Sequence, residues 1–253
     1  MYKKITKLFF YLIIYSFFGY CLESIVAIVT MGVIESRQSF VYGPFCVIYG
    51  IGAIILIYFL SKYSNSSIKL FLFGMILGSS IEYFGSLIGE KILGFIWWDY
   101  SNMFLNINGR TSLFYSICWG LISIFLIRFI HPKINFLYEY LTQKINYFTP
   151  IIYSVFVLFL ADAFISSLAL NNFYNKSIKN YNIGTPIELS YLENFSQLYE
   201  NTNIKEFIDS NFNNEKMIKT YPNILIPTIS GEYLSMRLFI NDVKPYYYKV
   251  FNK

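Results

Sequence analysis

The stretch from Glu82 to Arg110 contains the densest group of side chains in this chain that could bind an ion or a small solute. Its polar, charged and aromatic members are Glu82, Tyr83, Ser86, Glu90, Lys91, Trp97, Trp98, Asp99, Tyr100, Asn106, Asn108 and Arg110. The first of them end a long apolar run, where a carboxylate is costly unless it is paired or used. The rest form a polar, aromatic loop that is typical of the point where such a run leaves a membrane. The pattern predicts a membrane site on one face of a helix bundle.

Three carboxylates lie inside apolar runs, at Glu23, Glu82 and Asp162. At a rise of 1.5 Å per residue, they lie about 9, 4.5 and 3 Å from the midpoints of their predicted spans, all displaced toward the same side. Three anions at similar depth would repel one another, so at least one should be protonated or paired. One interpretation is a cation or proton site, or a polar cavity for a substrate. The other is a set of structural acids hydrogen-bonded to Tyr, Ser or loop amides.

Charged residues of the predicted outer loops extend the candidate site. Arg37, Asp99 and Arg110 lie beside aromatic residues and Gly, and they either contact a ligand or pair with one another to order the loops. A secondary group is better explained by the membrane–water interface, where tryptophans and solvated charges gather. Its members are Glu90, Trp97, Trp98 and Asn108.

The chain lacks the motifs of known soluble-type catalysts. No GxxxxGK[ST], GxSxG or HExxH sequence occurs, so the chain carries no P-loop ATPase of its own. Cys21, Cys46 and Cys118 all lie in apolar runs, and the single histidine, His131, precedes Pro132. These observations predict no metal site and no cofactor, and they favour a role other than catalysis.

The composition is that of a membrane protein. Of the 253 residues, 55% are hydrophobic and only 14% charged, whereas soluble domains have about 25% charged residues. Residues 1–170 hold seven acids and the shorter segment 171–253 holds eight. We therefore expect a membrane domain followed by a polar tail. The net charge of +5 is spread along the chain and gives no support for a nucleic-acid partner.

Five apolar runs are long enough to cross a bilayer, so the predicted fold is an all-α polytopic transmembrane bundle. They lie near residues 5–29, 43–61, 68–90, 111–130 and 150–170. Small-residue pairs such as Gly74 and Gly78 predict close approach of a neighbouring helix. Residues 131–148 predict an amphipathic surface helix. The tail, 171–253, is expected to be a small cap or partner-docking segment with helical patches near 187–200 and 203–219.

The distribution of basic residues predicts that the N-terminus is cytoplasmic, because Lys and Arg are enriched in cytoplasmic loops. With this orientation the cytoplasmic side holds Lys3, Lys4, Lys7, Lys62, Lys69, Arg128, Lys133 and Lys144. The opposite side holds Arg37, Lys91 and Arg110. Five spans then place the tail outside the cell.

The chain resembles the bacterial family of putative ABC-transporter type IV permeases. The resemblance is carried by Gly19 with Glu23, Arg37, Tyr42-Gly43-Pro44-Phe45-Cys46, Glu82-Tyr83, Glu90-Lys91, Trp97-Trp98-Asp99-Tyr100, Asn106-Ile-Asn-Gly-Arg110 and Trp119-Gly120. It covers about residues 1–170, with fainter continuations at Asp162 and Tyr221-Pro222-Asn223.

The resemblance implies a multi-pass permease subunit of the cell membrane that works with a separate ATPase. The first functional hypothesis is therefore transport, with a small solute in an outer-half cavity lined by Glu23, Glu82 and Asp162. The alternative is a non-transporting membrane protein, either a scaffold or regulator or an envelope-modifying protein. The lipid bilayer is an expected partner, and a second copy of the chain is a candidate partner.

Overall fold

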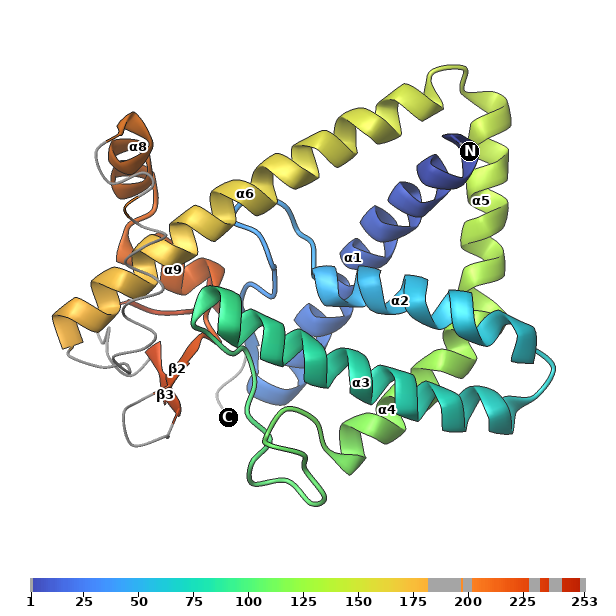
Figure 1. Cartoon of the computed structure of the whole chain (residues 1–253), viewed down its shortest axis with the longest axis horizontal. Helices are drawn as coiled ribbons and strands as arrows, with labels where there is room; N and C mark the ends of the chain where they lie inside the picture. The colour runs from blue at the N-terminus through green and yellow to red at the C-terminus, as the bar shows by residue number, and fades with distance from the viewer. Residues whose placement is uncertain (1, 182–196, 198–201, 228–232, 237–242, 251–253) are drawn as a thin grey trace. The chain divides into compact units, whose positions relative to one another are not determined.

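A computed structural model of the chain describes residues 2–181, 197, 202–227, 233–236 and 243–250, and these are predominantly helical (Figure 1). The helices are α1 (Tyr2–Met31), α2 (Val47–Leu60), η1 (Ser61–Tyr63), α3 (Ser67–Leu93), α4 (Leu113–Phe125), η2 (Leu126–Ile130), α5 (His131–Lys144), α6 (Phe148–Tyr181), α8 (Asn203–Asn211) and α9 (Asn214–Thr220). The short strands are β1 (Val33–Ile34), β2 (Leu225–Pro227), β3 (Tyr233–Ser235) and β4 (Tyr248–Lys249).

Within the described residues, four helical stretches are long and apolar enough to cross a membrane. They are Lys3–Met31, Ser67–Leu93, Leu113–Lys144 and Phe148–Ile178. The shorter apolar stretch Val47–Tyr63 corresponds to the second predicted span. The all-α membrane bundle is therefore confirmed, whereas the number of crossings and the orientation stay predictions.

The chain forms two compact units. The first consists of residues 1–21, 45–85 and 100–160, and the second of residues 22–44, 86–99 and 161–253. Helices α1, α3 and α6 contribute residues to both units. Each unit has its own hydrophobic core.

In the first unit, small residues of α3 let α4 pack directly against it. A Cβ atom at Gly74 would collide with Ser123, and one at Gly78 would collide with the indole of Trp119. Trp119 also stacks on Tyr49 of α2, with ring centroids 5.9 Å apart. The close approach expected from this glycine pair is therefore present.

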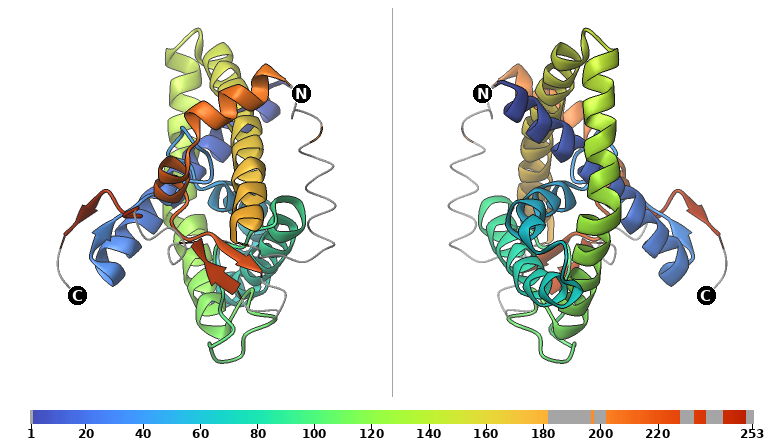
Figure 2. Two further views of the ribbon diagram at one scale, coloured as in Figure 1. Left: turned by 90° about the vertical axis from the view of Figure 1, so that its left-hand side faces the viewer. Right: turned by 90° about the vertical axis from the view of Figure 1, so that its right-hand side faces the viewer.

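A π-helical segment joins α4 to α5 without a break, and Figure 2 shows the resulting continuous rod. Pro132 follows at the start of α5 and has no backbone N–H to bond to the preceding turn. The wider π turn at Leu126–Ile130 absorbs this interruption. The predicted helix 131–148 thus ends earlier, at Lys144, and its position at the membrane surface stays a prediction.

In the second unit, the last third of α6 supports the core of the tail. Phe173, Tyr174 and Ile178 of α6 pack with Ile218 of α9 and Phe95 of the loop after α3. Strand β2 pairs with β3, and β1 pairs with β4, both antiparallel. The predicted patch at 203–219 corresponds to α8 and α9, and a turn follows at 221–224. The predicted helical patch at 187–200 falls almost entirely outside the described residues.

Candidate membrane site

Glu82 lies two residues past the middle of α3 and is only 6% exposed. Its carboxylate accepts a hydrogen bond from Thr111 Oγ1 at 2.8 Å and one from Tyr100 Oη at 3.2 Å. Thr111 immediately precedes Ser112, the N-cap of α4, and Tyr100 lies in the loop between α3 and α4. The buried acid thus connects the centre of one apolar helix to the loop that joins it to the next.

The loop over Glu82 has a defined conformation, which explains much of the Asn106–Arg110 motif. Asn106 donates to the carbonyls of Ser101 and Met103 and accepts from the N–H of Gly109. Asn108 has a φ of 52°, a left-handed conformation that Asn tolerates better than most residues. These contacts bring the Gly109 carbonyl within 2.7 Å of the Tyr100 N–H.

Tyrosines extend the polar surroundings of this loop. Asn108 donates to Tyr83 Oη at 3.0 Å, so the loop is tied to the residue that follows Glu82. Tyr100 stacks on Tyr115 of α4, with ring centroids 4.2 Å apart. Of the predicted secondary residues, Asn108 is therefore part of the loop that covers Glu82.

Asp162 is held differently, although it too is buried in a long apolar helix. Its Oδ2 accepts from the Gly43 N–H at 2.8 Å, and its Oδ1 accepts from the Tyr42 N–H at 3.3 Å and from Ser166 Oγ at 3.2 Å. Ser166 in turn accepts from the Val41 N–H. Three consecutive backbone amides are therefore fixed by one turn of α6, which favours an anchoring role for Asp162.

Arg37 pairs within its own loop. Its guanidinium lies 2.6 Å from Glu35 Oε1, and the Glu35 side chain is fully buried. Glu35 is not among the predicted site residues, although a carboxylate two residues before Arg37 is visible in the sequence. Glu23 is half-buried in the second half of α1. Glu82 lies in the first unit and Glu23 and Asp162 in the second, so the convergence of the three acids stays a prediction.

The remaining predicted residues lie in the loop after α3, except for Glu90, which lies in the last turn of α3. Asp99 is exposed, and Arg110 and Trp98 are half-buried. Trp97 packs on the backbone of α3 at Gly89, where no larger side chain would fit. Glu90 accepts a long hydrogen bond of 3.5 Å from Tyr233.

A second polar group in the first unit was missed by sequence reasoning. Side chains of α1 pair one by one with side chains of α5: Lys7 with Glu139 (2.8 Å), Tyr11 with Asn135 (2.7 Å) and Tyr15 with His131 (3.0 Å). Both series repeat every four residues, so each side chain lies on one helix face. We call this series of three pairs the polar ladder. The four-residue repeat can be recognised in the sequence of each helix, but the sequence does not indicate which side chains pair.

No group of three or more metal-ligating side chains occurs among the described residues. Two shallow hollows of about 290 and 360 Å³ lie in the second unit, one between α6 and α8 and one beside α9. Glu82 and Asp162 are both buried near the middle of candidate membrane-spanning helices, and Glu82 stands out because hydroxyl groups of Tyr100 and Thr111, in the loop that covers it, donate to its carboxylate.

The apolar helices and the buried acid of α3 define an α-helical integral membrane protein. Residues 10–167, more than half of the chain, match the family described as “Putative ABC-transporter type IV”. The chain belongs to this family. Neither the curated proteins nor the solved structures contained a match.

Proposed function

We propose that this protein is the permease subunit of an ABC-type transporter in the bacterial cell membrane and that it works with a separate ATPase. The family match and the four long apolar helices support this role. No ATPase motif occurs in the chain, so the energy for transport would come from a partner subunit.

The observation that carries the proposal is the burial of Glu82 near the middle of α3 under a structured loop. A carboxyl group in a membrane helix is expensive and usually marks the path of a substrate or ion. Its partners Tyr100 and Thr111 bond through hydroxyl groups, which can both donate and accept. Such partners suit a group that gains or loses a proton or a cation. We therefore propose that a small solute or cation is recognised at Glu82 when the loop 100–111 moves aside.

The partner is tested by purifying the intact, tagged chain from its own membrane and identifying the proteins that remain bound. An ATPase subunit in stoichiometric amount supports the transporter. Its absence, with a knockout phenotype confined to envelope composition, would contradict the proposal.

The site is tested by Glu82→Gln, which keeps the shape of the side chain but cannot ionise. We expect the variant to fold and to lose transport. Glu215→Gln is the matched control, because Glu215 is an exposed acid of α9 that pairs with Lys219. Full activity in Glu82→Gln would show that Glu82 has a structural role alone.

A second candidate is a non-transporting scaffold or regulator. It is favoured by the compact core of the tail and by the polar hollow beside α9, which is lined by Asn213, Glu215, Lys216 and Lys219 among others. Purification with a membrane partner that lacks ATPase motifs would support this candidate over the transporter.

A further inference from the structure

One face of α6 changes from apolar to polar along its length. Phe164, Leu168, Asn172 and Lys176 follow at intervals of four residues and therefore lie on the same face. α6 has 34 residues, whereas about 20 suffice to cross the hydrocarbon core of a bilayer. The last dozen or so residues of the helix can thus extend beyond the hydrocarbon, and the change from Leu168 to Asn172 marks the boundary.

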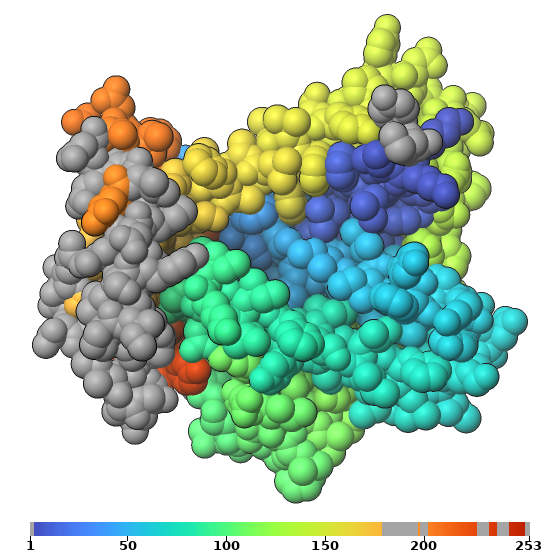
Figure 3. Space-filling model, viewed as in Figure 1, coloured from blue at the N-terminus to red at the C-terminus, as the bar shows by residue number. Residues whose placement is uncertain are grey.

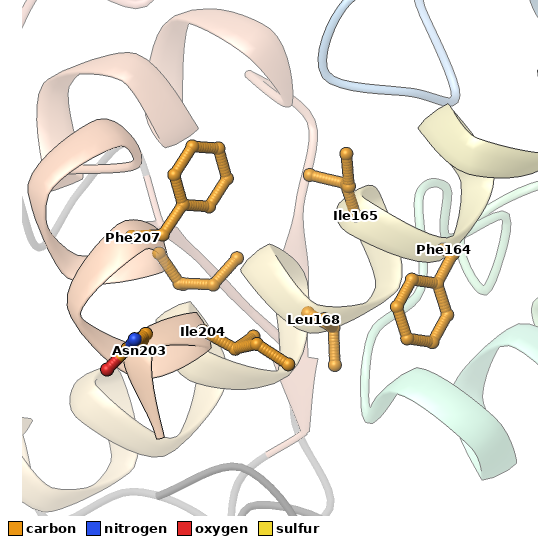
Figure 4. A pocket seen from close by; sticks show the side chains of 7 residues that line it. Phe164, Ile165, Leu168, Asn203, Ile204 and Phe207 are labelled. Atoms are coloured by element: carbon orange, nitrogen blue, oxygen red, sulfur yellow. The ribbon is translucent and has the colours of Figure 1, made fainter. Parts of the chain in front are cut away.

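Helix α8 contacts this face, with apolar side chains against its apolar part and polar side chains against its polar part. Ile204, Phe207 and Ile208 meet Phe164, Ile165 and Leu168 around an apolar hollow of about 290 Å³ (Figure 4). Asn203 supplies the polar side chain of the lining. The apolar side of α8 is therefore directed at the apolar part of α6.

The polar side of α8 is directed at the polar part of α6. Asp209 accepts from Asn172 at 2.8 Å and from Lys176 at 2.7 Å, and Lys205 donates to Asn172 Oδ1 at 2.9 Å. Two ammonium groups and one carboxylate leave this cluster with one net positive charge. An ammonium has three N–H donors, and the bond to Asn172 uses one of those of Lys205.

The apolar hollow is open rather than filled. Phe164 is 62% exposed, and Ile204 and Phe207 are each 44% exposed. Val157 and Leu160 of α6 are exposed as well, at spacings that continue the stripe ending at Phe164. Figure 3 shows much of α6 uncovered on one face. Because α6 is long and apolar enough to cross a membrane, this exposed stripe suits contact with lipid hydrocarbon.

We propose that the hollow between α6 and α8 binds an acyl chain of an anionic phospholipid, with the lipid phosphate at Lys205 and Lys176. The apolar hollow selects a lipid over free phosphate, and the adjacent net positive charge selects an anionic headgroup over a zwitterionic one. Helix α8 then lies in the membrane interface with its charged side toward water. This inference is independent of transport, because a protein that moves no solute would still bind the lipid.

The acyl-chain part is tested with the full chain in vesicles of phosphatidylcholine and phosphatidylglycerol that contain a phosphatidylglycerol with a photoreactive acyl chain. After illumination, peptide mapping should find label on 164–168 and 203–208. Phe207→Asn and Ile204→Asn should each lower this labelling severalfold. Phe84→Asn is the matched control, because Phe84 is an exposed aromatic residue of α3, away from the hollow, at 57% against 44% for Phe207. It should leave the labelling unchanged.

Circular dichroism and thermal unfolding show whether α8 has survived the Asn substitutions. Unchanged labelling in a folded Phe207→Asn variant would overturn the proposal. So would absence of label from α8 together with a dimer that Phe207→Asn dissociates, because the hollow would then be an interface between two copies of the chain.

The headgroup part is tested by comparing the same photoreactive chain on phosphatidylglycerol and on phosphatidylcholine. Lys205→Gln should reduce the preference for phosphatidylglycerol by about fivefold, the factor that corresponds to about 1 kcal/mol for a lysine near an anionic surface. Lys219→Gln, in which an exposed ion pair of α9 is removed, should keep the preference. Equal labelling by both lipids in the wild-type protein would contradict an anionic-headgroup site.

Discussion

Glu82 and Asp162 are both carboxylates buried in long apolar helices, but their partners differ in kind. Asp162 accepts from the hydroxyl group of Ser166, but it is also held by the backbone N–H groups of Tyr42 and Gly43, which can only donate. Glu82 is bonded by the hydroxyl groups of Tyr100 and Thr111, which can reverse their roles. The backbone N–H groups require the side chain at position 162 to remain a hydrogen-bond acceptor. The hydroxyl groups allow the side chain at position 82 to accept or to donate. A buried carboxylate with backbone N–H partners therefore suits a fixed loop, whereas one with hydroxyl partners suits the reversible binding that we propose for Glu82.

The largest effect is expected for Asp162→Asn. The amide must turn its NH₂ group toward one of the two backbone N–H groups, so at least one of these part-buried donors loses its partner. We expect a loss of roughly 3 kcal/mol in the free energy of unfolding, measured by denaturation in detergent micelles. Ser167→Ala is a control on the same helix, because Ser167 bonds only to its own helix among the described contacts. A loss as small as that of the control would remove the contrast between the two acids.

A smaller loss is expected for Glu82→Leu, in which the hydroxyl groups of Tyr100 and Thr111 are left without this partner. Hydroxyl groups can rotate toward other acceptors, and we expect a cost of roughly 1–3 kcal/mol, measured in the same denaturation experiment. A variant as stable as the wild type would indicate that the loop 100–111 does not depend on the acid.

Glu82→Gln should be the mildest of the three buried substitutions, with a loss of less than about 1 kcal/mol in unfolding free energy. Its amide keeps one acceptor, and its NH₂ group can donate to a hydroxyl oxygen. The comparison with Asp162→Asn is direct, since both changes replace a carboxylate by an amide of the same size. Equal destabilisation by the two amides would refute the distinction drawn from their partners.

Asp209 provides a carboxylate outside the membrane-spanning segments for comparison. Burial acts to raise the pKa of Asp209, but hydrogen bonds from Lys176 and Asn172 and the charges of Lys176 and Lys205 outweigh it, so the pKa lies below its usual value. A depressed pKa stabilises the fold above the unfolded value of about 3.9, and this contribution is lost as the pH falls through the folded value.

We therefore expect α8 to loosen from α6 only below about pH 4, with the smallest effect of the series because Asp209 is partly exposed. Hydrogen exchange of α8, corrected for the intrinsic pH dependence, measures the change. Asp209→Asn should abolish this pH dependence. Loosening of α8 at neutral pH in the wild type would contradict the assignment.

Local features of the sequence predicted much of the fold. The lengths of the apolar runs predicted the helices, and the spacing of Gly74 and Gly78 predicted the close contact of α3 with α4. A hydrogen bond from a tyrosine to a buried acid was also expected, and Tyr100 donates such a bond to Glu82. These predictions succeeded because they depend on periodicity and on the cost of burying charge.

The partners of Asp162 and the polar ladder could not be predicted, because they depend on contacts between distant segments. Asp162 lies 119 residues from Gly43, and nothing in either segment alone indicates the other. Likewise Tyr15 and His131 are 116 residues apart. In the sequence His131 is notable only as the residue before Pro132, whereas the fold places it opposite a tyrosine.

The π turn at Leu126–Ile130 has a consequence for how this chain can vary. A π turn holds one residue more than an α turn, so the additional residue is accommodated without changing the direction of the side chains that follow it. Deletion of one residue from this segment would tighten the π turn into an α turn and leave His131, Asn135 and Glu139 facing Tyr15, Tyr11 and Lys7. Deletion of one residue within α5 itself, between His131 and Asn135, would instead rotate Asn135 and Glu139 by about 100°, away from Tyr11 and Lys7. The wide turn therefore makes the segment before the polar ladder tolerant of a single-codon deletion that the ladder itself would not survive.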